Sequence, residues 1–203
     1  NNGSMQWDEV IRVSEHAASL GGSQIYLKPG EEMQVRDLFK SIAIASANDA
    51  VTALAERVAG TEEAFVEKMN AKAKELGMND TVFKNPTGLT EEGHLTTPYD
   101  MSIIGRHLVQ DYPEIIEFSG LYEDYIRQDT ESPFWLVNTN KLLKYVDGVD
   151  GLKTGYTQEA GYCLTATANR GEMRVIAVVM GASKSDIRNQ EVTRLIEYAY
   201  GQY

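Results

Sequence analysis

The chain has 203 residues, 42% of them hydrophobic, which suits a single domain with a packed core. Its 30 acidic and 19 basic residues give a net charge of −11, so a polyanion would be repelled and nucleic acid is an unfavourable partner. The single cysteine, Cys163, excludes a disulfide framework, and we expect it to be a buried core thiol. No apolar run is long enough to span a bilayer, and no signal peptide is visible.

The first part of the chain predicts short elements joined by turns. Residues 7–14 alternate weakly as an extended segment, residues 14–18 suit a helical turn, and Gly21-Gly22 ends that turn. Residues 23–27 are again extended, and residues 28–31 predict a turn. The sequence has no initiator methionine, and we expect it to begin within a longer protein.

Two helices are predicted next, separated by a short break. The first covers residues 35–45, and the second runs from about Asp49 to residue 59 with Asn48 or Asp49 as its N-cap. The apolar face of the first helix consists of Leu38, Phe39, Ile42 and Ala45.

Further helices follow at residues 62–76, 98–110 and 113–118. Thr61 caps the first of these, and Pro98 lies near the first position of the second. The core residues expected from residues 62–76 are Phe65, Met69 and Leu76.

Three histidines, His16, His94 and His107, are spread along the chain. None has a second histidine or a cysteine at the spacing of a metal site. We therefore expect His107 at the boundary of the core, and we predict neither a metal ion nor a cofactor.

The last part of the chain predicts a sheet and a closing helix. An irregular hairpin is expected from residues 122–129 and 134–140, and residues 161–168 and 173–181 alternate as two strands around a turn. Residues 185–200 predict an amphipathic helix. Its apolar stripe is Ile187, Val192, Leu195, Ile196 and Ala199. This order of elements indicates an α+β fold.

The triplet Lys153-Thr154-Gly155 closes a short β-branched run just before these two strands. It offers a cation, a hydroxyl and a bare backbone in one place, so Lys153 and Thr154 can hold a carboxylate. Gly155 has no side chain and lets a substrate approach the strand edge. Taken alone, the triplet also suits an ordinary solvated turn.

The sequence Ser46-Ala47-Asn48 lies between two predicted buried helices. A loop at this place can direct both polar side chains into one cleft, where the Ser46 hydroxyl relays a proton and the Asn48 amide grips a substrate amide. The structural alternative is that Asn48 or Asp49 caps the next helix.

Together and in this order, the two motifs resemble those of the low-molecular-mass penicillin-binding proteins. They are most similar to the serine-type D-alanyl-D-alanine carboxypeptidases of Gram-positive bacteria. The resemblance covers residues 1–203 as one partial D,D-peptidase domain. It implies a penicillin-binding protein or β-lactamase-like transpeptidase fold, an antiparallel sheet packed with helices, whose first strands and nucleophile helix are missing from this chain. The flanking segments that share the resemblance are residues 21–25, 44–50, 88–89, 147–155 and 160–162.

This resemblance implies acyl-enzyme chemistry on peptidoglycan. A serine attacks the carbonyl between the last two D-alanines of a stem peptide, and β-lactams acylate the same serine. Ser46 would shuttle protons, and Asn48 would position the substrate or support a catalytic lysine. Lys153 would supply positive potential and a proton link to Ser46.

The resemblance also implies a substrate-binding strand and a location. Thr154 would bind the terminal carboxylate beside Gly155, and the backbone N–H of Tyr156 would be one oxyanion donor. Arg188 is a weaker candidate for the carboxylate, by position only. The location implied is extracytoplasmic, at the cell envelope, with membrane association only through segments absent here.

The Ser-x-x-Lys motif, which supplies the nucleophile and its base in that family, does not occur in this sequence. We expect it to lie before residue 1, so that the 203 residues alone neither cleave peptides nor react with penicillin. A class A β-lactamase is the less favoured enzyme, because no loop carries a deacylating glutamate with a nearby asparagine. The alternative hypothesis is a non-catalytic relative that binds cell-wall peptide or a partner protein. The missing motif favours this hypothesis, and the presence of the other two motifs counts against it.

Overall fold

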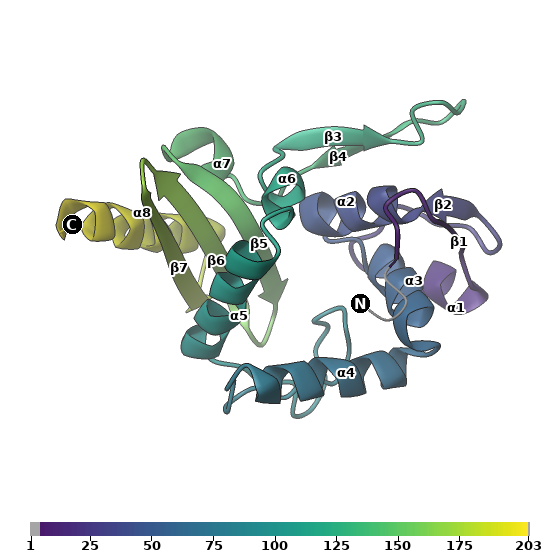
Figure 1. Cartoon of the computed structure of the whole chain (residues 1–203), viewed down its shortest axis with the longest axis horizontal. Coiled ribbons are helices and arrows are strands. Elements are labelled where there is room, and N and C mark those ends of the chain that lie inside the picture. Colours follow the sequence, from purple (N-terminus) through teal and green to yellow (C-terminus); the bar gives the residue numbers. More distant parts are fainter. Residues whose placement is uncertain (1–4, 203) are drawn as a thin grey trace.

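The computed structural model describes residues 5–202, and the predictions for residues 1–4 and 203 lie outside them. A three-stranded antiparallel sheet organises the C-terminal half (Figure 1). Its strands lie in the order β5 (Val149–Thr157), β6 (Gly161–Arg170) and β7 (Met173–Ala182). Within the part of the chain that the structure describes, β5 is an edge strand with β6 on one side only. Its outer edge is therefore not paired with another strand among the described residues.

Two helices cover opposite faces of this sheet, α5 (Pro98–Asp111) and α8 (Ser185–Gln202). Side chains alternate along β6, so Leu164, Ala166 and Ala168 join the apolar cluster that contains residues of α8. The intervening Thr165 faces α5, where a Cβ on Gly105 would lie 3.2 Å from its methyl group. The predicted α+β organisation is confirmed.

The predicted apolar stripe of α8 is only partly buried. Val192 and Ile196 are fully buried, whereas Ile187 and Leu195 are 38% and 45% exposed. A helix that rests on one sheet buries only the residues that face it, and the stripe is wider than that contact. Cys163 is half-buried and not the core thiol expected, because it lies near the turn between β5 and β6.

The helical part surrounds a second apolar core, which includes the fully buried Leu38 and Ile44. Its main helices are α2 (Val35–Ala45), α3 (Asn48–Ala59) and α4 (Glu62–Glu75), close to the predicted bounds. Its smaller elements are α1 (Glu15–Ser19) and the two-stranded sheet of β1 (Val10–Arg12) with β2 (Glu32–Gln34). Residues 23–27, expected as extended, form no strand, and β2 was not predicted.

Shorter elements join the two parts. A hairpin of β3 (Glu123–Ile126) and β4 (Phe134–Val137) packs on α2, and Figure 1 shows it as a projecting arm. The helix α6 (Ile115–Ser119) contacts both α2 and β5. The unpredicted helix α7 (Leu142–Tyr145) leads into β5.

The expected core residues of α4 have a different environment. Phe65, Met69 and Leu76 are only partly buried, and they line an apolar cavity of about 270 Å³ with Met78 and Ile104. The helix therefore turns its apolar face toward a space that residues 5–202 leave incompletely filled.

Two further features of residues 5–202 bear on function. No group of three histidine, cysteine, aspartate or glutamate side chains is placed to hold a metal ion. None of the helices there is long and apolar enough to cross a membrane.

Candidate active site

The Lys153 ammonium lies on the edge strand β5 in a partly desolvated place. Its Nζ donates to the carbonyl oxygen of Thr154 at 2.9 Å. Burial, reinforced by the positive charge of Arg188, lowers the pKa of Lys153 to about 8. A lysine with this pKa can give up and recover a proton near neutral pH, which general acid–base chemistry requires.

The Thr154 hydroxyl has a partner that the sequence did not indicate. Its Oγ1 lies 2.5 Å from Oγ1 of Thr139, a residue between β4 and α7. Thr139 belongs to a stretch without clear periodicity, so no sequence signal singled it out. The pair presents two hydroxyl groups at the strand edge.

Packing within residues 5–202 does not require a glycine at position 155. A Cβ there would meet only the Cβ of Cys163, at 3.9 Å, which is ordinary contact. At Gly151, which lies earlier on the same strand, a Cβ would overlap the Ser119 side chain. Gly155 therefore keeps free a space that the described residues do not use, which suits close approach of a ligand.

The next residue, Tyr156, lies on the opposite face of the strand from Gly155. Its side chain is 59% exposed, and its ring stacks on that of Tyr162 with centroids 4.3 Å apart. Tyr162 is its cross-strand partner in the ladder, so the stack holds the ring along the strand.

Arg188 on α8 lies close to this end of the sheet and is only 5% exposed. Its guanidinium donates to the side chain of Asn189 and, at 3.3 Å, to the carbonyl oxygen of Cys163. Burial lowers the pKa of Arg188, although the group remains a cation. Arg188 thus places a fixed positive charge near Lys153 and the triplet.

The second motif occupies the junction between α2 and α3. Ser46 follows α2 with φ 60° and ψ 37°, a left-handed conformation that is unusual for serine. Its N–H donates to the Ile42 carbonyl at 3.1 Å, which closes the helix. The side chain is partly exposed at this corner.

Asn48 is the first residue of α3 and is almost fully buried. Its amide Nδ2 donates to the Gly21 carbonyl at 2.8 Å, and its backbone N–H donates to the Ser23 carbonyl at 2.8 Å. The predicted cap role of Asn48 or Asp49 is wrong. The N-cap of α3 is Ala47, without a side-chain bond, because both polar side chains instead hold the segment at residues 21–27.

The structure gathers the seven predicted site residues into two groups. Lys153, Thr154, Gly155 and Tyr156 share β5, with Arg188 beside them. Ser46 and Asn48 share the α2–α3 junction, and α6 packs between α2 and β5. No hydrogen bond or ion pair joins the two groups within residues 5–202.

An edge strand with Lys-Thr-Gly, together with Ser-Ala-Asn at the junction of two helices, is the arrangement expected of a penicillin-binding protein. The sequence profile of the D-alanyl-D-alanine carboxypeptidases, peptidase family S11, matches residues 1–184. The chain belongs to this family.

Characterised relatives span a range of identity. The chain is 58% identical over all of its 203 residues to the D-alanyl-D-alanine carboxypeptidase DacF of Bacillus subtilis and covers 52% of that protein. It is 41% identical over 184 residues to DacC of Escherichia coli, which is 89% of this chain and 44% of that protein. The chain thus spans about half the length of these relatives.

Solved structures confirm the predicted fold class. The D-alanyl-D-alanine carboxypeptidase DacD of Francisella tularensis matches with a TM-score of 0.91 and 33% identity, over 97% of this chain and 59% of that one. Penicillin-binding protein D2 of Listeria monocytogenes, in its cefotaxime-bound form, matches with a TM-score of 0.84 and 33% identity, over 97% of this chain and 78% of that one.

Proposed function

We propose that this chain is part of a serine D-alanyl-D-alanine carboxypeptidase that removes the terminal D-alanine from peptidoglycan stem peptides and is acylated by β-lactams. The observation that carries the proposal is the open edge of β5, where Gly155 leaves unused space beside Lys153, whose pKa is about 8. A stem peptide ends in a carboxylate, and a β-lactam carries one at the matching place, so both suit this strand.

Each residue has a role that its surroundings support. The Thr154 hydroxyl, oriented by Thr139, donates to the terminal carboxylate, and the charges of Lys153 and Arg188 attract that carboxylate. The Tyr156 N–H donates to the oxygen that becomes negative when the scissile carbonyl is attacked.

Ser46 and Asn48 act from the other side of the substrate. Ser46, at the corner after α2, passes a proton between the nucleophile and the leaving D-alanine, with Lys153 as a further proton carrier. Asn48 holds the substrate or the lysine that activates the nucleophile.

The attacking serine itself is not among these residues. Residues 1–203 contain no Ser-x-x-Lys, so we propose that a segment outside this sequence supplies the nucleophile and its base. The 203 residues alone are then inactive and unreactive toward penicillin. The whole protein acts outside the cytoplasm, at the cell envelope where its substrate lies.

One relative supports the β-lactam part of the proposal. Penicillin-binding protein D2 of Listeria monocytogenes has been solved in cefotaxime-bound and ampicillin-bound forms. By analogy, a β-lactam would lie along β5 of this chain with its carboxylate at Thr154.

Covalent labelling by a fluorescent penicillin tests the proposal. The 203-residue chain and the longest form of the protein found in its source cell are incubated with the reagent and separated by electrophoresis. We expect label on the longer form only. In that form, Lys153→Met should slow labelling about 100-fold or more, because a positive charge at the reacting centre is lost.

Lys144→Met serves as the matched control, since the Lys144 ammonium lies over the Tyr122 ring and is not among the candidate site residues. We expect its labelling rate to stay within about twofold of the parent. Labelling of the 203-residue chain would contradict the inactivity of the fragment. A longer form that neither labels nor releases D-alanine would favour the non-catalytic relative, and rapid turnover of the β-lactam would favour a β-lactamase.

A further inference from the structure

Asp49, the residue after the Ser-Ala-Asn motif, is a completely buried carboxylate with 0% exposure. It forms no ion pair with any residue in the range 5–202. Its oxygens instead accept the N–H groups of Ile25, at 3.1 and 3.2 Å, and of Leu27, at 3.0 Å. Its Oδ1 also accepts the N–H of the neighbouring residue Ala50 at 2.9 Å. Because this site is buried, the N–H groups of Ile25 and Leu27 would lose their partner without gaining water if the segment moved, so the bonds to Asp49 hold the segment in place.

The segment that Asp49 holds has no regular secondary structure of its own. Residues 23–27 belong to no strand, and Tyr26, between the two bonded residues, has φ 57°. A left-handed tyrosine is strained by about 1–2 kcal/mol. This conformation therefore persists because the bonds to Asp49 offset its cost.

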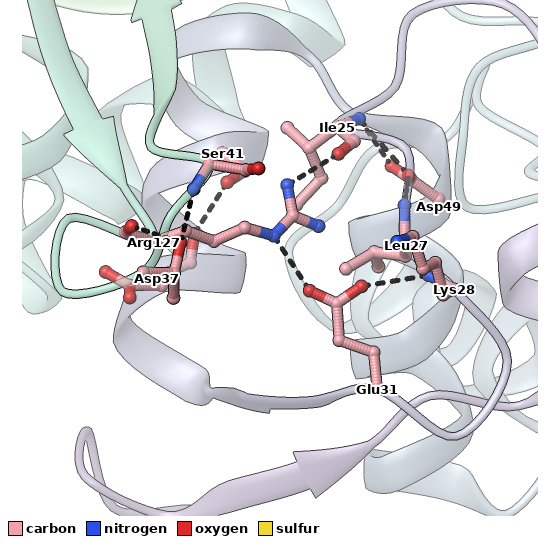
Figure 2. Close-up of polar contacts among 10 residues, drawn as sticks. Ile25, Leu27, Lys28, Glu31, Asp37, Ser41, Asp49 and Arg127 are labelled. Carbon is pink, nitrogen blue, oxygen red and sulfur yellow. Dashed lines mark hydrogen bonds and ion pairs between the residues drawn. The ribbon is translucent and has the colours of Figure 1, made fainter.

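Arg127, which follows strand β3, forms hydrogen bonds to the same segment from the opposite side (Figure 2). Its Nη1 donates to the Ile25 carbonyl at 2.9 Å, and its Nε donates to Glu31 at 2.8 Å. The N–H and the carbonyl of Ile25 are thus held by two different parts of the fold. Figure 2 shows Ile25 between the Asp49 carboxylate and the Arg127 guanidinium.

Glu31 completes this arrangement. Its second oxygen accepts the backbone N–H of Lys28 at 2.9 Å. Burial alone would raise the pKa of Glu31, but the hydrogen bonds from Arg127 and Lys28 outweigh it and hold the pKa below its ordinary value. The carboxylate is therefore ionised at neutral pH and keeps the guanidinium in place.

The held segment is also what positions Asn48. The Gly21 carbonyl accepts the Asn48 side-chain amide, and the Ser23 carbonyl accepts the Asn48 backbone N–H, both at 2.8 Å. A shift of residues 21–27 would therefore move the candidate substrate-binding amide.

We propose that Asp49 is a positioning residue of the active site, which fixes the segment at residues 21–27 and through it the orientation of Asn48, with Arg127 as the second support of Ile25. This inference rests on the proposed function for its catalytic consequence. Asp49 touches no substrate; it acts through the two carbonyls that orient Asn48.

The test compares two buried carboxylates in the longest form of the protein found in its source cell. Asp49→Asn keeps the size but turns an amide donor toward a backbone N–H. Asp100→Asn is the matched control, because Asp100 is also buried and accepts Asp80 N–H at 2.9 Å and the Thr81 hydroxyl at 2.6 Å, away from the Ser-Ala-Asn motif.

Two readouts are taken at a temperature where each variant is folded. The first is the rate constant for acylation by a fluorescent penicillin, and the second is hydrogen exchange at the backbone N–H of Asn48. For Asp49→Asn we expect acylation about tenfold slower or more and faster exchange at Asn48, since a small displacement of a positioning group is costly. For Asp100→Asn we expect acylation within about twofold of the parent.

Equal slowing in both variants would overturn the inference, because the effect would then reflect general loss of stability. Unchanged acylation and exchange in Asp49→Asn would overturn it as well. If the parent is not acylated at all, the proposed function fails, and faster exchange at Asn48 in Asp49→Asn alone still decides the positioning role. If Asp49→Asn does not fold, Arg127→Gln replaces it in the test. We expect this variant to be acylated about threefold more slowly than the parent. Unchanged acylation and unchanged exchange in this variant would count against the inference.

Discussion

Gly22 packs so tightly against Asn48 that an added methyl group tests the geometry of the candidate site. A Cβ on Gly22 would lie 2.8 Å from Nδ2 of Asn48, and Gly22 has φ 81°. Gly22→Ala therefore combines two costs, a left-handed alanine and displacement of the Asn48 amide. We expect both lower stability and a disturbed Asn48.

The two costs have different sizes. A left-handed alanine costs about 1–2 kcal/mol, of which about 0.4–1 kcal/mol is offset because alanine restricts the unfolded chain. Displacing the amide breaks its bond to Gly21 and leaves a buried donor unpaired, which costs about 1–3 kcal/mol more. The sum predicts destabilisation by about 2–4 kcal/mol.

Two other glycines separate these contributions. Gly60 has φ 86° with nothing within 4 Å of an added Cβ, so Gly60→Ala measures the backbone cost alone, about 0.5–1 kcal/mol. Gly21 has no positive φ and equally open surroundings, so Gly21→Ala should change stability by less than about 0.5 kcal/mol. Urea denaturation with a common slope measures all three variants. If Gly22→Ala costs no more than Gly60→Ala, the close contact with Asn48 is refuted.

Three further predictions follow from buried polar groups. Thr52 is fully buried, and its hydroxyl has no hydrogen-bond partner among residues 5–202. Thr52→Val should therefore raise the free energy of unfolding by about 1 kcal/mol, and a loss of stability in the same denaturation assay would contradict the absence of a partner. The folded state lowers the pKa of Lys153 from 10.5 to about 8, so the unfolded chain binds the extra proton between these values and stability rises with pH across that window. Lys153→Met should therefore be more stable than the parent at pH 7, with a difference of up to about 3 kcal/mol that shrinks toward pH 10.5; a constant difference would argue against desolvation of the ammonium. The folded pKa of Glu31 lies below its ordinary value of 4.5, so the ionised form of Glu31 stabilises the fold above pH 4.5. Glu31→Gln should therefore be less stable than the parent at pH 7, and its stability should approach that of the parent in acid. Equal stability of the two proteins at pH 7 would count against the ion pair with Arg127.

The sequence predicted the elements whose signals are local and long. The bounds of α2 were predicted correctly because an apolar face over residues 35–45 is followed by a polar break at Ser46. The strands β6 and β7 followed from alternation around a turn, with ends within a few residues. The elements that were missed, β2 and α7, have three and four residues, too few for a period to show.

What the sequence could not predict depends on distant contacts. Asp49 and Asn48 have the composition of a helix cap, but they bond to a segment more than twenty residues earlier, and no local rule reveals such a partner. Periodicity likewise found the apolar residues of α4 and α8 but not which of them would have a neighbour to pack against. Thr139 became visible only when β4 and β5 placed it beside Thr154.

The two supports of Ile25 also differ in the length of chain that each must close. The bond to Asp49 spans 24 residues, whereas the bond to Arg127 spans 102. The entropy of loop closure makes the longer contact about 1.3 kcal/mol harder to form. During folding, the segment at residues 21–27 can therefore dock on α3 before the β3–β4 hairpin exists. Arg127 then joins a segment that is already shaped, so Ile25 connects a contact that is favoured early to one that closes a much longer loop.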